Sequence, residues 1–335
     1  MCNVFSKIKK AAVPVAIATA ASLGLSAPAM ADWSPKKPVE LIIMAGAGGG
    51  ADQIARLLQG LIEKKDLSPR PIIPINKPGG SGAEALRYIQ DKAGDDHTIL
   101  VTLNSFYTTP VIQKGIGVDV SNFTPIGRMA IDTFVLWVNS GREDITDLDS
   151  YVAAVKAAGT NWKVGGTGTG QEDSILTAMM EKEFGYDVTY IPFPGGGTVA
   201  KNLVGNHVDS TVNNPAEQNE FYRAGETKPI VQFTAERLPA YPDVPTANEL
   251  GVNMEYYMQR SINGPPGMSK EAQDWYINLF KTLFDSEEWQ KFCTDDGLAC
   301  HEWLAGDDLG AYHTQQIALH KELIETVGAT AITGE

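Results

Sequence analysis

Glycine-rich loops that could bind an anion are the most conspicuous chemical feature of the sequence. The first, Gly46–Ala51, comes one residue after the apolar run Val39–Met44. Glycine permits a positive φ and lets a ligand approach the bare backbone. The helical pattern that begins at Asp52 has unpaired N–H groups and the positive end of the helix dipole in its first turn. Such a turn can bind an anion without Arg or Lys.

The same arrangement of apolar run, glycine loop and helical pattern occurs three more times. These loops are residues 76–82 (NKPGGSG), 165–170 (GGTGTG) and 194–198 (PGGGT). Two of the four loops lie in each half of the chain, which predicts two lobes that face each other across a cleft and direct backbone N–H groups at one ligand. The alternative is ordinary glycine turn chemistry, repeated in a large α/β protein.

Strands and helices are expected to alternate along most of the chain. Apolar runs predict strands at 39–44, 70–75, 98–103, 134–138, 163–164, 188–193, 208–212 and 230–233. Helical periodicity predicts helices from 52 and at 83–89, 148–158, 173–184, 199–204 and 308–327. Alternation of this kind is typical of an α/β fold in which helices flank mainly parallel sheets.

The first 31 residues have the features of a secretory signal peptide. Three lysines precede the apolar, alanine-rich run 11–25, and Ala29-Met30-Ala31 fits the small-x-small cleavage rule. We expect cleavage after Ala31 and a periplasmic mature protein. A retained membrane anchor is the alternative, although the run is short for a membrane span.

Composition argues against several classes of function. The net charge of −14 makes nucleic acid a poor partner. The five histidines show no metal-ligand spacing, and no G-x-S-x-G motif is present. We therefore expect no enzyme activity, no cofactor and no metal site.

Two cysteines remain after the leader, Cys293 and Cys300. Export implies an oxidising compartment, in which such a pair tends to form a disulfide. Asp295, Asp296 and Gly297 between them have the composition of a turn. A disulfide is therefore expected, with two free thiols as the alternative.

The run 235–251, AERLPAYPDVPTANELG, resembles the ER-P-x-x-PDVPT-x-x-E-x-G signature of a known family. That family comprises the substrate-binding proteins of tripartite tricarboxylate transporters, called TctC or Bug. The resemblance covers nearly all of the chain after the leader. Further similar segments are GAGGGADQIAR, NKPGGSGAEA, GGTGTGQEDS, IPFPGGGTVAKNLVGNHVD and INGPPGMSKEA.

The resemblance implies a two-lobed periplasmic binding protein of type II, the Venus-flytrap fold. Such a protein captures a small carboxylate, which here could be a di- or tricarboxylate, an aromatic carboxylate or an amino acid, and delivers it to membrane permease subunits. We expect a monomer. Lobe one would comprise residues 32–133 and 257–335, and lobe two residues 134–256.

The family's ligand-binding positions are carried over to the matching residues of this sequence. In lobe one they are Ala47, Gly48, Asp52, Ser81, Gly82, Asn104 and Ser105. In lobe two they are Thr167, Thr169, Gly170, Gly195, Gly196, Thr198 and Asn213. Asp52 is expected to cap and shape its helix rather than contact an anionic ligand.

The sequence departs from the family pattern at the third loop, where Gln171 and Ser174 replace a serine and a histidine, with Glu172 and Asp173 beside them. Two acids near a ligand carboxylate would repel it unless they face a cationic group, which leaves room for an amino-bearing acid. Alternatively, both acids stabilise only the start of their helix. For Arg260, a salt bridge to a surface acid is expected rather than a ligand contact.

Two other functions remain as alternatives. Gly46, Gly48 and Ala51 match the G-x-G-x-x-A pattern of a dinucleotide-binding oxidoreductase. Asn76 and Lys77 stand where such a site needs an acid for the ribose, which disfavours that function. The second alternative is a sensor that presents its ligand to a membrane kinase.

Overall fold

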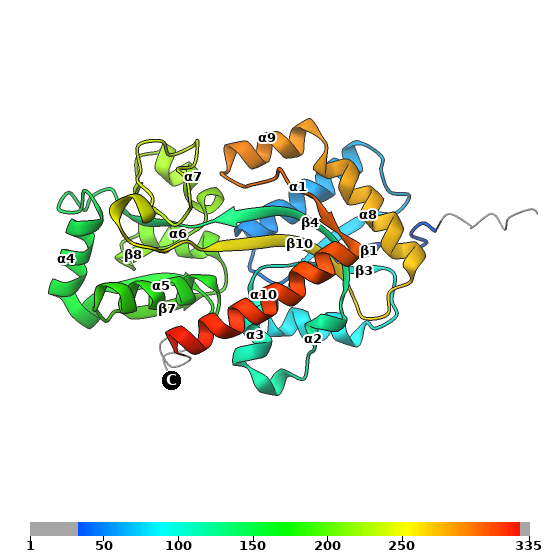
Figure 1. The fold of residues 1–335 in the computed structure, drawn as a ribbon. Helices are drawn as coiled ribbons and strands as arrows, with labels where there is room; N and C mark the ends of the chain where they lie inside the picture. Colours follow the sequence, from blue (N-terminus) through cyan, green and yellow to red (C-terminus); the bar gives the residue numbers. More distant parts are fainter. Residues whose placement is uncertain (1–32, 329–335) are drawn as a thin grey trace, which may run out of the picture. The chain divides into compact units, whose positions relative to one another are not determined.

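The structure is a computed structural model that describes residues 33–328. The predicted signal peptide, residues 1–31, lies outside the described residues. Two sheets organise the described chain, each with helices packed on it (Figure 1). We call each sheet with its helices a lobe.

The first sheet has the strand order β11-β4-β10-β3-β1-β2. Its strands are β1 (Val39–Ile43), β2 (Ile72–Asn76), β3 (Thr98–Val101), β4 (Thr124–Thr133), β10 (Tyr257–Gly264) and β11 (Leu304–Ala305). The second sheet has the order β7-β6-β8-β5-β9. Its strands are β5 (Val135–Asn139), β6 (Lys163–Thr167), β7 (Thr189–Phe193), β8 (Ser210–Thr211) and β9 (Thr227–Gln232).

The α-helices connect these strands or follow them. They are α1 (Gly50–Lys64), α2 (Ala83–Asp91), α3 (Ser105–Ile112), α4 (Leu148–Ala158), α5 (Glu172–Phe184), α6 (Gly196–Val204), α7 (Pro215–Arg223), α8 (Lys270–Phe284), α9 (Glu287–Asp295) and α10 (Gly306–Val327). Short 3₁₀ turns occur at Lys114–Ile116, Val120–Asn122, Gly159–Asn161 and Asn248–Leu250.

The two-lobed α/β class is confirmed. Parallel pairing joins β1 to β2 and β3 in the first sheet, and β6 to β7 and β8 in the second. The other pairs are antiparallel, so both sheets are mixed where mainly parallel sheets were predicted. The long antiparallel pair β4–β10 accounts for most of this difference in the first sheet.

The carboxyl ends of the parallel strands place helix starts where a ligand crevice is expected in an α/β fold. β1 leads into α1, β3 into α3, and β6 into α5. β1 and β3 are strands of the buried core, with apolar residues packed around them. This packing fixes the positions of their carboxyl ends. The last helix, α10, contacts β4 and α3 of the first lobe and α5 of the second (Figure 1).

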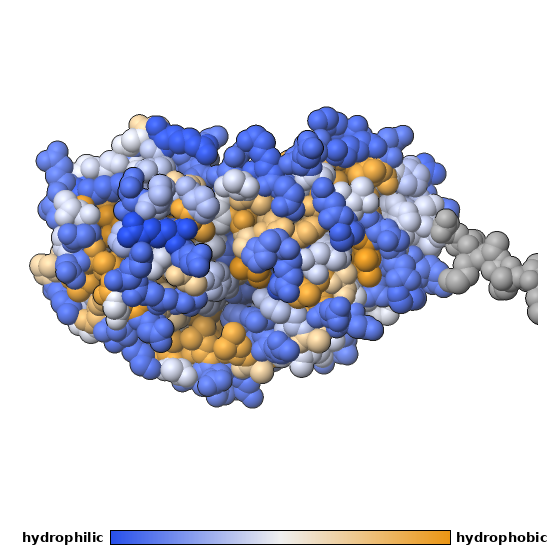
Figure 2. Space-filling view, turned by 45° about the horizontal axis from the view of Figure 1, so that its top comes forward, coloured by the Kyte–Doolittle hydropathy of each residue, from blue (hydrophilic) through white to orange (hydrophobic). Residues whose placement is uncertain are grey.

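Polar residues cover most of the surface, as the view in Figure 2 shows for one side. Few large apolar side chains are exposed in the described chain, and Leu319 of α10 is the most exposed of them, at 54%. A disulfide joins Cys293 of α9 to Cys300. Between residues 33 and 328, no helix is long and apolar enough to cross a membrane.

Candidate functional site

The starts of α1 and α3 are each capped by a carboxylate that comes from the second lobe. Gly49, which precedes α1, has no capping side chain, and the backbone N–H of Gly50 donates to Glu217 Oε1 at 3.0 Å. At α3, the N–H of Ser105 donates to Glu172 Oε1 at 2.7 Å. Both helix starts therefore hold an anion, as unpaired N–H groups and the helix dipole favour.

Local sequence around α7 explains the position of Glu217. Pro215 occupies the first turn, Asn214 is the N-cap, and Glu217 is the third helical residue, an arrangement typical of a capping box. The Glu217 Oε2 atom accepts hydrogen bonds from Asn213 Nδ2 at 2.7 Å and from the Asn214 N–H at 3.3 Å. These bonds leave Oε1 directed at the first lobe.

Glu172 and Asp173 form the first turn of α5, and each is 3% exposed. Asp173 Oδ2 accepts a hydrogen bond from the N–H of Thr167, at the end of β6, at 2.7 Å. Both acids line a cavity between the lobes together with Glu217. Their role therefore extends beyond the start of their own helix.

Burial raises the pKa of all three of these carboxyl groups. For Glu172 and Glu217, hydrogen bonds from backbone N–H groups and the charge of Arg260 oppose this rise without cancelling it. For Asp173, the neighbouring charge of Glu217 adds to the effect of burial, and its pKa lies well above the usual range. Low solvent access and like charges both disfavour the ionised form.

Arg260 of β10 lies at the same cavity and is 1% exposed. Its Nε donates to Asp132 Oδ2 at 2.9 Å, and its Nη2 donates to the same oxygen and to Asn214 Oδ1. Asp132 is the last-but-one residue of β4 and is also buried. The expected salt bridge to a surface acid is therefore wrong, because β4 brings a buried acid against β10.

Two hollows that share the lining residue Glu217 lie between the lobes. The inner cavity has a volume of about 20 Å³, which is room for one water molecule. An outer vestibule of about 400 Å³ lies beside it and is lined from the first lobe by Ala47, Gly48 and Gln53. Glu217 lines both hollows, so this side chain separates them.

Three further hydrogen bonds join the lobes around the inner cavity. The Gly46 N–H donates to Pro194 O at 2.9 Å. The hydroxyl groups of Ser81 and Thr108 donate to Thr169 O at 2.8 Å and to Gly170 O at 3.0 Å. All four glycine loops predicted from the sequence thus contact the opposite lobe directly: the first loop contacts the fourth, and the second contacts the third.

The structure gives the predicted site residues three different positions. Those that line the two hollows are Thr167, Gly195 and Gly196 in the inner cavity, and Ala47 and Gly48 in the vestibule. Those that bond between the lobes through side chain or backbone are Ser81, Ser105, Thr169 and Gly170. Those that line neither hollow and support neighbouring groups are Asp52, Gly82, Asn104, Thr198 and Asn213.

The supporting residues hold the loops in shape. Asp52 accepts a hydrogen bond from the Gly48 N–H at 2.9 Å and pairs with Arg56. Gly82 has a φ of +89°, and a Cβ there would meet Met44 Cε at 2.7 Å, so only glycine fits without strain. Asn104 donates to Tyr257 O at 2.7 Å and thereby ties the start of α3 to β10.

Sequence reasoning missed Glu217 and Asp132. The sequence pattern predicts a strand at 208–212 and no helix over 215–223, because Asn213, Asn214 and Pro215 are typical of the end of a strand. The N-cap asparagine, the proline and the glutamate three residues after the cap were the signal that could have identified α7. Asp132 lies in a strand interrupted by Pro125 and Gly127, which weakens the strand pattern.

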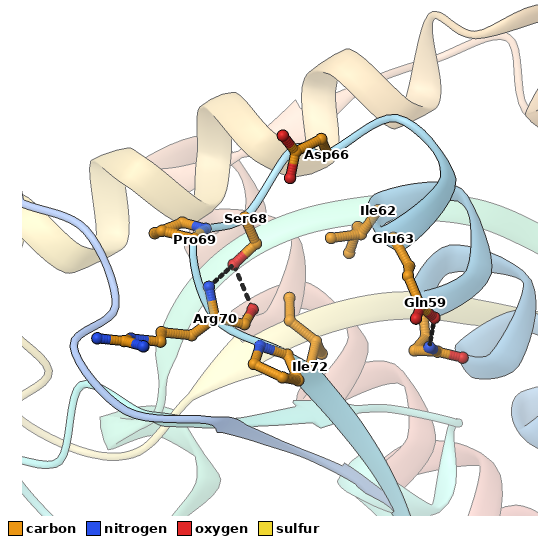
Figure 3. Close-up of a pocket in the computed structure, with 9 residues that line it drawn as sticks. Gln59, Ile62, Glu63, Asp66, Ser68, Pro69, Arg70 and Ile72 are labelled. Atoms are coloured by element: carbon orange, nitrogen blue, oxygen red, sulfur yellow. Dashed lines mark hydrogen bonds between the residues drawn. The ribbon is translucent and has the colours of Figure 1, made fainter.

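A separate hollow of about 230 Å³ lies at the other end of α1, around Ser68 and Arg70 (Figure 3). There the Ser68 hydroxyl donates to Arg70 O at 2.7 Å. This hollow is at the amino end of β2, away from the helix starts, and contains residues of the first lobe alone. It therefore lacks the features of an interlobe ligand site.

Within the described chain, no cluster of three or more His, Cys, Asp or Glu side chains has an arrangement that could hold a metal ion. The acids of the inner cavity instead accept hydrogen bonds from N–H groups.

Several protein sequences resemble this chain. A protein in the gbd 5′ region of Cupriavidus necator is 23% identical over 321 residues, 96% of this chain and 97% of its own length. The protein BugT of Bordetella pertussis (strain Tohama I) is 26% identical over 247 residues, 72% of this chain and 73% of its own length.

Solved structures share the fold. The periplasmic binding protein BugD has a TM-score of 0.83 at 22% identity and covers 88% of this chain and 99% of its own. MatC from Rhodopseudomonas palustris, solved with bound malate, has a TM-score of 0.79 at 22% identity. The match covers 87% of this chain and 99% of the MatC chain. The sequence model described as "Tripartite tricarboxylate transporter family receptor" matches residues 54–329. With this match over most of its length, the chain belongs to the TctC family of tripartite tricarboxylate transporter receptors.

Proposed function

We propose that this protein is a periplasmic solute-binding protein that captures a small carboxylate between its lobes. It then delivers the ligand to the membrane permease subunits of a tripartite tricarboxylate-type transporter. Membership of the receptor family supports this function, and so does the structure of MatC, a relative in fold that was solved with malate.

The observation that carries the proposal is the pair of carboxylates at the starts of α1 and α3. Each helix start presents an N–H group to the interlobe space, and each holds a carboxylate oxygen within 3.0 Å. A ligand carboxylate has the same acceptor geometry as the carboxylates of Glu217 and Glu172. It can therefore bind the same helix starts when the lobes separate.

Capture follows from a hinge motion. In the open form the loops of both lobes are exposed, and in the closed form they meet around the ligand. A ligand shifts this equilibrium only by its higher affinity for the closed form. We propose that lobe one comprises 32–133 with 257–335 and that lobe two comprises 134–256. On this division the hinge lies at the passages from β4 to β5 and from β9 to β10.

We also propose that the protein is exported to the periplasm and acts there as a soluble monomer. Cleavage after Ala31 would release the mature protein into the periplasm, where the disulfide between Cys293 and Cys300 is stable. A net charge of −14 favours a soluble monomer that does not bind nucleic acid. The protein performs no catalytic step.

A thermal-shift screen of the mature protein tests this function. The panel contains di- and tricarboxylates, aromatic carboxylates, amino acids and nicotinamide dinucleotides. A ligand that binds only the folded state adds about 2.7 kcal/mol at 100 times its Kd, which gives a clear rise in melting temperature. A rise with at least one small carboxylate or amino acid is expected. A rise with dinucleotides alone would overturn the proposal.

A further inference from the structure

The inner cavity carries an excess of negative charge. Three carboxyl groups line it, from Glu172, Asp173 and Glu217, and Arg260 is the one cationic side chain among its lining residues. All four residues are at least nine-tenths buried. Buried charges of like sign are costly unless a cation or a proton compensates them.

Arg260 compensates the three lining acids only in part, because its charge is already paired with a fourth acid. Its Nε and Nη2 atoms both donate to Asp132 Oδ2, and Asp132 is 1% exposed. The three lining acids accept hydrogen bonds from backbone or amide N–H groups, at one oxygen of Glu172, one oxygen of Asp173 and both oxygens of Glu217, and these donors carry no net charge. The cavity therefore favours an additional positive charge.

A second observation indicates where an acceptor group would bind. The third guanidinium nitrogen, Arg260 Nη1, is buried and has no hydrogen-bond partner among the described residues. The hydroxyl of Thr167, another lining residue, is also buried without a partner there. A buried donor without an acceptor costs about 1–3 kcal/mol, so the cavity favours an oxygen acceptor beside these groups.

We propose that the natural ligand is a small zwitterion that carries an ammonium group as well as a carboxylate. This inference rests on the proposed function and narrows its ligand class. The ammonium group, with three N–H donors, lies among Glu172, Asp173 and Glu217. The ligand carboxylate takes the Gly50 N–H that Glu217 releases when the lobes part, and it also accepts a charge-assisted hydrogen bond from Arg260 Nη1.

Entry requires the lobes to part. The inner cavity, at about 20 Å³, admits one water-sized group, whereas the adjoining vestibule of about 400 Å³ admits a small molecule. Charged side chains of both signs line the vestibule, as suits a ligand that carries both charges: Lys201, Arg223, Glu217, Glu220 and Asp296. Glu217 separates the two hollows, and its bond to the Gly50 N–H must break for the ligand to pass.

Calorimetric titration of the mature protein with matched compounds tests the inference. Each pair differs by an amino group: glutamate and glutarate, β-alanine and propionate, γ-aminobutyrate and butyrate. Ethanolamine serves as an amine without a carboxylate. The amino-bearing member of at least one pair is expected to bind about tenfold tighter or more, the effect of a charge-assisted hydrogen bond.

The outcomes separate the inference from the proposed function. If the plain acids bind as tightly as the amino acids or tighter, the zwitterion inference fails and the carboxylate function stands. If ethanolamine binds and no carboxylate does, the proposed function fails. If none of the compounds binds, both fail for ligands of this size.

Variants give a second readout that a purely structural role would not change. Glu217→Gln and Glu172→Gln keep the shape and remove the charge, and are expected to lower the affinity ratio between the amino acid and its plain partner about tenfold. Glu183→Gln, on the exposed side of α5, is the matched control and keeps the ratio. If the Glu217 and Glu172 variants lose equal affinity for the amino acid and for its plain-acid partner, the proposed role of these two acids is wrong.

Discussion

The backbone N–H of Gly50 in the first lobe donates a hydrogen bond to the carboxylate of Glu217 in the second, at 3.0 Å. These residues are 167 positions apart, and the bond caps a helix that has no capping side chain of its own. Ser105 and Glu172 repeat the relationship at α3. The protein's own acids thus occupy the anion sites at two helix starts.

Stability should rise as the pH falls from neutral into the mildly acidic range. Burial raises the pKa values of Glu172, Asp173 and Glu217, so the folded protein binds protons at a pH where the unfolded chain has released them. The free energy of unfolding therefore increases as the pH falls through these raised values toward the unfolded ones. Melting temperature measured across pH checks this.

The gain in folding stability at mildly acidic pH should reverse in stronger acid. Burial by itself would raise the pKa of Asp52, but hydrogen bonds from Arg56, Gly48 and Asn76 outweigh it and lower that pKa. The stability from Asp52 is present above its unfolded pKa and is lost as the pH falls through the folded value. The variant Asp173→Asn should show a smaller rise in melting temperature between neutral and mildly acidic pH. The exposed control variant Glu183→Gln should show the same rise as the unchanged protein. A steady decline of melting temperature from neutral pH downward would refute the prediction.

Gly196→Ala should impair both folding and ligand binding. A Cβ at this position would lie 1.9 Å from Glu217 Oε1, so the carboxylate must move and release the Gly50 N–H. Overpacking of this kind costs about 1–3 kcal/mol. Denaturant unfolding and ligand titration of the variant measure the two effects.

Gly60→Ala is the matched control for that substitution. Gly60 lies within α1, and a Cβ there meets nothing within 4 Å. Alanine is the better helix former, and the variant should gain up to about 1 kcal/mol. Similar stability changes at Gly60 and Gly196 would show that close contact with Glu217 is not the cause.

The Arg260–Asp132 pair should show strong coupling. Arg260→Met leaves Asp132 buried without its cation, which costs about 3–5 kcal/mol. The double variant Arg260→Met with Asp132→Leu removes both charges and should recover a large part of that loss. A double-mutant cycle by denaturant unfolding measures the coupling. Strictly additive losses would contradict a direct ion pair.

Loss of the disulfide should destabilise α9 and the segment after it. Cys293 and Cys300 are seven positions apart, and a loop this short corresponds to about 2 kcal/mol in the chain-entropy account. Cys293→Ser with Cys300→Ser, compared with the oxidised protein, should lower the free energy of unfolding by that amount. Unchanged stability would indicate that the bond constrains little in the unfolded chain.

Local patterns predicted most of the helices and strands. The run Val39–Met44 with the glycine loop after it gave β1 and the start of α1, which begins two residues before the predicted Asp52. The helix at 148–158 agrees with α4. Such elements follow from apolar periodicity over a few residues, which the sequence displays directly.

Contacts between distant segments were harder to predict. β4 (Thr124–Thr133) carries Pro125, Gly127 and two charged residues, and its pairing with β10 makes it a strand. The sequence identified the helix starts as anion sites. It did not show that Glu217, 167 residues after Gly50, would fill one of them, because that depends on how the lobes meet.

A crystal structure of the mature protein with its tightest binder from the carboxylate panel would show directly where the ligand binds. We predict a ligand between the lobes, near the starts of α1 and α3 and in contact with Arg260. A ligand bound elsewhere, for example in the hollow beside Ser68 and Arg70, would contradict it.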